Sequence, residues 1–154
     1  MDVLWQVETN IDDMNPQNME YVFSRILEAH ANDVWAVPVM MKKGRMASML
    51  CVLCTEERLD TILEIVFSET TSVGARYFPV QRAICDREIK TVLVDGAELH
   101  CKICSYKGCI TNISAEYDDC RAAAVRTGKP IKEWQRKVKE EAYAQYGYTI
   151  SKQD

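Results

Sequence analysis

The chain has 154 residues, of which 47% are hydrophobic, so it can bury the core of one domain or of a small domain with an appendage. No segment reaches the roughly 20 apolar residues that a membrane-spanning helix needs, and residues 1–9 lack the basic and then apolar layout of a signal peptide. The net charge of -4 argues against a nucleic-acid-binding protein, which usually carries a basic surface.

The chain opens with the pattern of a strand followed by a helix. Residues 3–8 alternate between two faces with a period of two, which indicates a strand. Asn15 and Pro16 then predict the N-cap and the first position of a helix. The apolar stripe of that helix extends to His30, which we expect at the edge of the core.

Two strands, a helix and a further strand follow. Residues 34–41 are rich in β-branched side chains, and residues 46–54 form a nearly continuous apolar run that is typical of a central strand. Thr55 predicts the cap of the second helix, and residues 75–82 predict a fourth strand. The order of elements is therefore β-α-β-β-α-β.

This order predicts a ferredoxin-like α+β sandwich over residues 1–84, with the strands arranged 4-1-3-2 in the sheet. Pro38 and Pro79 fall in the second and fourth strands, which this arrangement places at the two edges. Proline is tolerated there because it cannot donate to a neighbouring strand. The positions of the prolines therefore support the predicted fold.

Residues 85–154 predict a small antiparallel β unit with two C-terminal helices, packed on the first domain. Asp95 and Gly96 indicate the turn of a hairpin, and a third strand follows the hairpin. Gly128 predicts the end of one helix and Pro130 the start of the last, which we expect to stop before a frayed tail at residues 148–154.

Three charged or small-residue segments stand out at residues 8–13, 42–45 and 71–76. Each alone has an ordinary explanation: acids beside a helix N-terminus, a solvated hairpin tip, and a helix exit. The predicted topology, however, makes strands one and two parallel and strand four antiparallel to strand one. All three segments should therefore meet at one end of the sheet.

Carboxylates beside lysine and arginine, with a glycine-containing loop, suit a metal-bound polyphosphate. Mg²⁺ and Mn²⁺ prefer oxygen ligands, arginine offers phosphate a planar fork of donors, and lysine offers it a point charge. Gly74 would allow backbone N–H groups to approach an oxyanion closely. The sequence therefore predicts an anionic-ligand site at this end of the sheet.

Four motifs resemble the C-terminal part of LarC, a family of nickel insertion proteins. They occur in order at residues 8–16, 41–45, 69–76 and 116–120, and so extend over nearly the whole chain. The resemblance implies an enzyme of the lyase or chelatase type that uses CTP to insert nickel into pyridinium-3,5-bisthiocarboxylic acid mononucleotide. The product would be the nickel-pincer cofactor.

The resemblance further implies that this chain binds CTP with Mn²⁺ or Mg²⁺. We expect the CTP site to use Asn10, Lys42, Lys43, Arg45, Ser72, Gly74 and Arg76, the four cationic side chains holding the triphosphate. We expect Asp12 and Asp13 on the metal. The family's larger N-terminal part would be a partner, because the chain starts at the first motif. Self-association through exposed strand edges is also expected, and no catalytic acid or base can be assigned.

Other metal-binding patterns are weaker. Two C-x-x-C sequences, at residues 51–54 and 101–104, lie in predicted strands, where positions i and i+3 face opposite sides. We expect their cysteines to be buried and, like all seven in the chain, reduced in the cytoplasm. Glu116, Asp118 and Asp119 could ligate a metal, but acids are common at helix N-termini.

Two other functions remain open from sequence. A non-catalytic ferredoxin-like module could sense a small anion at the same end of the sheet. Alternatively, a module could assemble subunits through its edge strands. Nucleotide hydrolysis would separate the enzyme from the sensor, and binding of any nucleotide would separate both from the assembly module.

Overall fold

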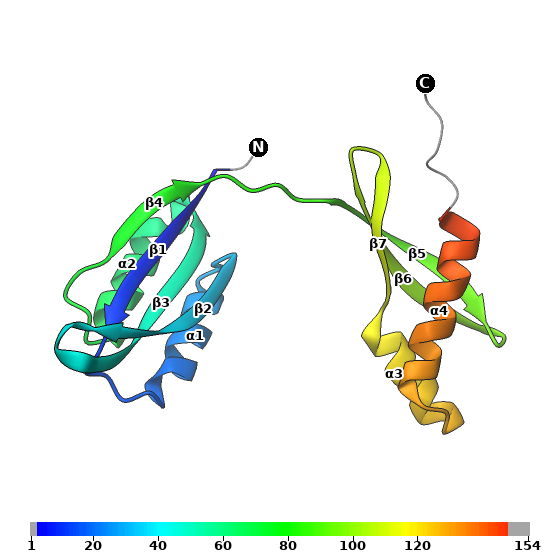
Figure 1. The fold of residues 1–154 in the computed structure, drawn as a ribbon, viewed down its shortest axis with the longest axis horizontal. Helices are drawn as coiled ribbons and strands as arrows, with labels where there is room; N and C mark the ends of the chain where they lie inside the picture. Colours follow the sequence, from blue (N-terminus) through cyan, green and yellow to red (C-terminus); the bar gives the residue numbers. More distant parts are fainter. Residues whose placement is uncertain (1–2, 148–154) are drawn as a thin grey trace. The chain divides into compact units, whose positions relative to one another are not determined.

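A computed structural model describes residues 3–147 (Figure 1). The chain divides into two compact units, at residues 1–82 and 83–154. The described residues form a mixed α+β architecture with two antiparallel sheets and four α-helices, which confirms the predicted class. None of the helices within residues 3–147 is long and apolar enough to cross a membrane. The tail expected to be frayed lies outside the described residues.

The first unit follows the predicted order of strands and helices. Its elements are β1 (Leu4–Ile11), α1 (Asn18–Glu28), β2 (Asp33–Met41), the short 3₁₀ turn η1 (Lys42–Gly44), β3 (Arg45–Thr55), α2 (Glu56–Glu69) and β4 (Arg76–Val80). The sheet order is β2-β3-β1-β4, and every neighbouring pair is antiparallel. The predicted strand order is therefore confirmed, with Pro38 and Pro79 on the edge strands.

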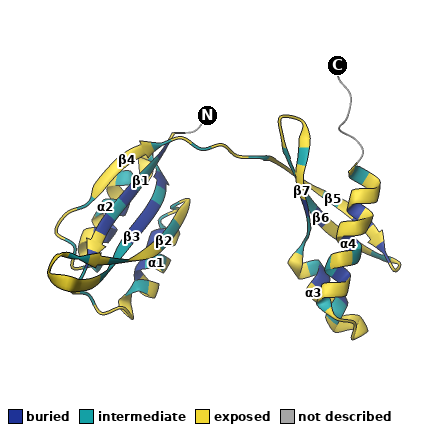
Figure 2. Ribbon diagram, viewed as in Figure 1, coloured by how far each residue is buried: buried dark blue, intermediate teal, exposed yellow. Residues whose placement is uncertain are grey.

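The core of the first unit lies between one face of the sheet and helices α1 and α2 (Figures 1 and 2). Strand β1 shows how the two faces differ, because Val7, Thr9 and Ile11 are buried toward the helices. Glu8 and Asn10 alternate with them and face the other way. Within the described part of this unit, no helix covers that second face of the sheet.

Helix α1 begins later than the sequence predicts. Its N-cap is Gln17 rather than Asn15, so the predicted cap is wrong by two residues. Asn15 instead organises a turn before the helix: its Oδ1 accepts from the Gln17 backbone N–H at 3.1 Å, and its carbonyl accepts from Asn18 N–H at 3.0 Å. An Asn side chain that bonds two residues ahead favours such a turn over immediate helix entry.

The same helix also ends earlier than its apolar stripe suggests. His30 is exposed and has a left-handed backbone (φ 62°), so its predicted place at the core edge is wrong. Its N–H donates to the Leu27 carbonyl at 2.9 Å, and Ala31 N–H reaches the Ile26 carbonyl at 3.3 Å. These bonds satisfy the last carbonyls of α1, as a glycine-type helix terminus does.

The second unit contains a three-stranded sheet and two helices. Its elements are β5 (Asp86–Val94), β6 (Ala97–Tyr106), β7 (Cys109–Ala115), α3 (Tyr117–Thr127) and α4 (Ile131–Tyr146), with sheet order β5-β6-β7. Asp95 and Gly96 have φ values of 49° and 78°, which confirms the predicted hairpin turn. Gly128 is left-handed and ends α3 as predicted, and Pro130 precedes α4.

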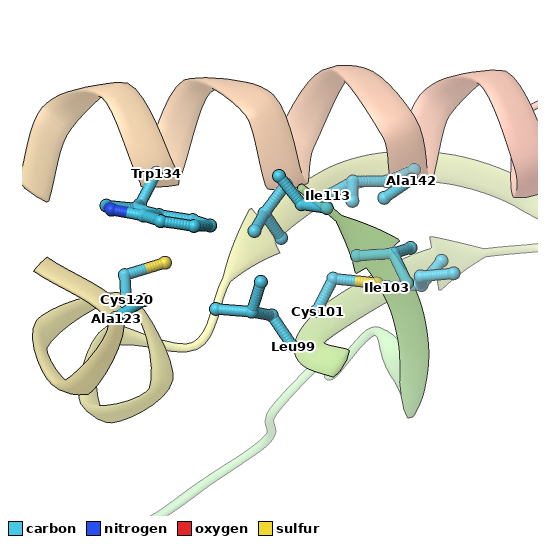
Figure 3. Packing of buried hydrophobic residues seen from close by; sticks show 11 residues of the cluster. Leu99, Cys101, Ile103, Ile113, Cys120, Ala123, Trp134 and Ala142 are labelled. Carbon is cyan, nitrogen blue, oxygen red and sulfur yellow. The ribbon is translucent and has the colours of Figure 1, made fainter. Parts of the chain in front are cut away.

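The core of the second unit is formed by the sheet and both helices (Figure 3). Trp134 extends from α4 toward Cys120 and Ala123 of α3, and its Nε1 donates to Thr127 Oγ1 at 3.3 Å. Leu99, Cys101, Ile103 and Ile113 cover the sheet side. This packing holds α3 and α4 on one face of β6.

Candidate functional site

The three segments singled out by the sequence meet at one end of the first sheet. Strand β1 ends at Ile11 and β2 at Met41, whereas β3 starts at Arg45 and β4 at Arg76. These ends coincide because β1 is antiparallel to both β3 and β4, and β2 is antiparallel to β3. Side-chain contacts link the three segments directly. The predicted convergence is therefore confirmed.

An ion pair connects the acidic segment with the basic turn. Arg45 Nη1 lies 3.1 Å from Asp12 Oδ2, and the two side chains are 58% and 23% exposed. A pair this open to water contributes little to stability, typically less than about 1 kcal/mol. Either side chain can therefore leave the other for a ligand group at little cost in stability.

The small-residue loop contacts the acidic segment through hydroxyl groups. Thr71 Oγ1 donates to Asp13 Oδ1. Thr9 is buried, its hydroxyl hydrogen-bonds with that of Ser72, and it donates to the Gly74 carbonyl at 2.9 Å. The Thr9 contacts anchor the loop on β1 through uncharged groups, whereas Thr71 uses the Asp13 carboxylate just beyond the strand.

The basic turn has an unusual backbone. Lys43 is left-handed (φ 64°), as is Gly44 after it (φ 68°). Lys42 and Lys43 are both exposed, and neither side chain makes a hydrogen bond or ion pair with any residue between 3 and 147. The turn therefore presents two cationic groups beside the acidic segment without neutralising them.

Arg76 lies on the uncovered face of the sheet, directly opposite Glu8 in the strand register. Its Nε donates to Glu8 Oε2 at 2.8 Å, and its Nη2 approaches Asn10 Oδ1 at 3.3 Å and Met49 Sδ at 3.0 Å. Glu8 Oε1 also accepts from Gln6 Nε2 at 2.6 Å. Asn10 and Arg76 are thus brought together, but the arginine charge is already balanced by Glu8.

Glu8, Thr9 and Thr71 lie inside the segments that the sequence singled out, but sequence reasoning gave them no role, although all three contact predicted site residues. The alternation along β1 held part of the signal that could have identified these residues, because it places Thr9 on the helix-facing side of the sheet and Glu8 on the opposite side. A polar residue on the core-facing side needs a partner, and Thr9 finds it in the loop.

Glu116 and Asp119, at the start of α3, make their contacts within the second unit. Asp119 Oδ2 accepts from the His100 backbone N–H at 2.7 Å and lies 2.6 Å from His100 Nδ1. These hydrogen bonds hold the pKa of the Asp119 carboxyl below its ordinary value. Glu116 Oε1 lies 3.4 Å from Lys102 Nζ. The contacts made by Asp119 join the start of α3 to β6.

The two C-x-x-C sequences lie in β3 and β6. Cys54 belongs to the core under the helices, whereas Cys51 is level with Glu8 on the other face of the sheet. Burial raises the pKa of the thiols of Cys51, Cys54 and Cys101. Within residues 3–147, no group of three or more His, Cys, Asp and Glu side chains is arranged to hold a metal ion.

Known proteins resemble this chain over most of its length. Residues 1–135 match the family described as "Nickel insertion protein". A pyridinium-3,5-bisthiocarboxylic acid mononucleotide nickel insertion protein from Thermotoga sp. (strain RQ2) is 44% identical over 132 residues, 86% of this chain and 33% of that protein. Its counterpart from Desulfitobacterium hafniense (strain DSM 10664 / DCB-2) is 36% identical, over 88% of this chain and 34% of that protein.

A solved structure shares the fold. LarC2, described as the C-terminal domain of a cyclometallase involved in the synthesis of the NPN cofactor of lactate racemase, was solved in its apo form and aligns with a TM-score of 0.82 and 30% identity. The alignment covers 92% of this chain and 97% of LarC2. The chain spans about a third of the length of the curated relatives cited above. The chain belongs to the nickel insertion protein family, and the part of the family that it resembles is the C-terminal domain of LarC.

Proposed function

We propose that this chain is the CTP- and divalent-metal-binding part of a nickel insertase. The complete cytoplasmic enzyme would insert nickel into pyridinium-3,5-bisthiocarboxylic acid mononucleotide and form the nickel-pincer cofactor. Family membership supports the reaction, and one structural observation supports the site. Two unneutralised lysines lie in a turn whose neighbouring residue, Arg45, is paired with Asp12 at the same end of the sheet.

The basic turn would hold the triphosphate. Lys42 and Lys43 need no rearrangement of partners to contact phosphate, because they have none among residues 3–147. Arg45 can exchange the Asp12 carboxylate for a phosphate oxygen, since the pair is exposed. Arginine and lysine are the usual phosphate-binding side chains.

The acidic segment would hold the divalent metal. Mg²⁺ commonly takes one or two carboxylates together with phosphate oxygens and water, and Asp12 and Asp13 supply carboxylates of this kind. The bound metal would balance the negative charge of the phosphates. Asp12 would change partner from Arg45 to the metal, and that change would leave the Arg45 guanidinium free to donate to phosphate.

The remaining predicted residues would complete the nucleotide site. Ser72 and Gly74 form the loop beside β1, and Asn10 and Arg76 lie together on the sheet face. Because Glu8 already balances the Arg76 charge, a contact with the base or sugar suits Arg76 better than one with phosphate. The ferredoxin-like assignment of this unit is part of the proposal, supported by its strand order.

The rest of the activity would need further parts. The N-terminal two thirds of the relatives, a second copy of this chain, or both would complete the precursor and nickel sites. Nickel is the cargo of the reaction. No residue of this chain is assigned as a catalytic acid or base.

The test is titration calorimetry of the chain with CTP and with ATP, each with Mn²⁺, on wild type and on Lys43→Ala. We expect CTP to bind more tightly than ATP and Lys43→Ala to weaken binding. If folded protein binds neither nucleotide, this chain has no nucleotide role on its own, and a subunit-assembly function gains support. Binding without turnover by the full-length enzyme would favour an anion sensor.

A further inference from the structure

Two methionines lie side by side near the end of the β2–β3 hairpin, next to the basic turn. Met40 and Met46 are cross-strand partners, two residues before Lys42 and two residues after Gly44. Their side chains are 72% and 66% exposed. Cross-strand partners have Cβ atoms about 5 Å apart, so the two thioether side chains can form one apolar surface.

Exposed apolar side chains of the first unit concentrate at this end of the sheet. Among the described residues of that unit, the three most exposed large apolar side chains are Met40, Met46 and the fully exposed Val73 of the small-residue loop. Single exposed apolar residues are common on protein surfaces, whereas an apolar patch rimmed by polar groups indicates a binding surface. A ligand that matches this end of the sheet would therefore carry an apolar group as well as negative charge.

The methionine pair lies on the opposite face of the sheet from Asn10 and Arg76. Met46 has the same place in the strand alternation as Leu50, which points to the core under the helices. Leu50 is buried and Met46 is exposed, so the cover by the helices ends between them. The methionines are therefore separate from the groups proposed to contact the base or sugar of CTP.

We propose that Met40 and Met46 bind the pyridinium ring of pyridinium-3,5-bisthiocarboxylic acid mononucleotide; this inference rests on the proposed function. This substrate combines a flat aromatic ring with negatively charged thiocarboxylate and phosphate groups. Thioether sulfur makes favourable contacts with aromatic rings, and the positive charge of a pyridinium ring strengthens its attraction to the electron-rich sulfur. Lys42 and Lys43 supply cationic groups for the anions of the same ligand.

The distance from the methionines to the turn suits a mononucleotide. Met40 precedes Lys42 by two residues, so a strand rise of about 3.3 Å per residue places the methionine pair roughly 7 Å from the turn. The ribose that joins a ring nitrogen to a phosphate has a comparable length. The phosphate can therefore contact a lysine while the ring lies on the methionines. Each lysine has three N–H donors, so the turn can contact CTP on one side and the pyridinium mononucleotide on the other.

The test is NMR of the chain labelled with ¹³C at its methionine methyl groups, because an aromatic ring that lies on a thioether shifts the resonance of that methyl. One ligand is pyridinium-3-carboxylic acid mononucleotide, which has the ring, a carboxylate and the phosphate. The other is ribose 5-phosphate, which lacks the ring. We expect only the first to shift the methyls of Met40 and Met46. The methyl of Met49, which lies on the face of Arg76, should not shift.

Affinities of variants give a second measurement. The double variant Met40→Gln/Met46→Gln is compared with the control Leu93→Gln, since Leu93 is 63% exposed and also lies two residues before a hairpin turn, in the second unit. We expect the double variant to bind the pyridinium mononucleotide about threefold to tenfold more weakly and to keep its affinity for ribose 5-phosphate. Leu93→Gln should keep both affinities. Urea unfolding should show equal stability, because all three side chains are exposed.

The outcomes separate this inference from the proposed function. Equal affinities and equal methyl shifts for the two ligands would overturn the pyridinium site. Shifts of Met40 and Met46 by CTP with Mg²⁺, but not by the pyridinium mononucleotide, would assign the pair to cytosine and overturn the inference while the CTP site stands. Binding of the pyridinium mononucleotide without binding of CTP would support the methionine site and overturn the CTP role. Binding of neither would overturn both.

Discussion

Replacement of Lys43 by asparagine should separate ligand binding from stability. Lys43 is left-handed, and this conformation costs an L-residue about 1–2 kcal/mol, less for asparagine, which tolerates it better. The lysine side chain makes no hydrogen bond or ion pair that would be lost among residues 3–147. We therefore expect Lys43→Asn to leave the free energy of unfolding unchanged or to raise it by a few tenths of a kcal/mol, roughly.

The same substitution, Lys43→Asn, should weaken nucleotide binding. A hydrogen bond to a charged group contributes about 1.5–3 kcal/mol, so loss of one lysine–phosphate contact should weaken CTP binding about tenfold to a hundredfold. Titration calorimetry with CTP and Mn²⁺ measures the affinity, and urea unfolding of the same samples measures stability. Binding should also weaken as salt is added, because exposed charges are screened.

The second unit provides a matched control. Lys107 has the same conformation (φ 50°), is also followed by a left-handed glycine, Gly108, and is exposed. Lys107→Asn should therefore change backbone strain and net charge as Lys43→Asn does, but leave CTP affinity unchanged. Equal weakening by both variants would show that only net charge matters, and unchanged binding in Lys43→Asn would refute the phosphate role of Lys43.

Four further changes test other parts of the structure. Asp12→Asn should lower stability by less than about 1 kcal/mol but abolish the Mn²⁺ dependence of CTP binding in calorimetry. Gly74→Ala should fold normally, because nothing lies within 4 Å of the added Cβ; weaker CTP binding would then show close approach of the ligand to this loop. Trp134→Ala should cost about 3–5 kcal/mol in urea unfolding, since the ring is buried in the second core. The fold lowers the pKa of Asp119, so the contribution of its carboxylate to stability is complete above the ordinary pKa of about 3.9 and is lost as pH falls through the lower folded value. Asp119→Asn should therefore remove this part of the loss of stability in acid. Unfolding measured at pH ~6 and pH ~3, for wild type and variant, would show the difference.

The strand order could be predicted because local and global signals agreed. Pro38 and Pro79 fit only edge strands, and the apolar run at 46–54 fits only a central one. The limits of α1 could not be predicted in the same way. Residues 28–32 contain no glycine, so nothing in the sequence marks His30 as the left-handed residue that ends the helix.

The candidate site shows a similar division. Topology alone brought the three segments to one end of the sheet, because strand direction fixes where each segment leaves the sheet. Topology could not show which charges are balanced. Lys43 and Arg76 look equivalent in sequence, yet Lys43 has no partner among residues 3–147 and Arg76 is bound by Glu8.

This difference follows from the register of β1 and β4. The pairing of Glu8 with Arg76 places opposite charges side by side, where they attract each other before any ligand arrives. A shift of one residue in β1 would instead place buried Thr9 opposite Arg76 and leave the arginine unbalanced. An unbalanced cation can bind a phosphate without giving up a partner, whereas Arg76 would first have to leave Glu8. The register of a single strand pair therefore decides whether Arg76 is already neutralised before any ligand arrives.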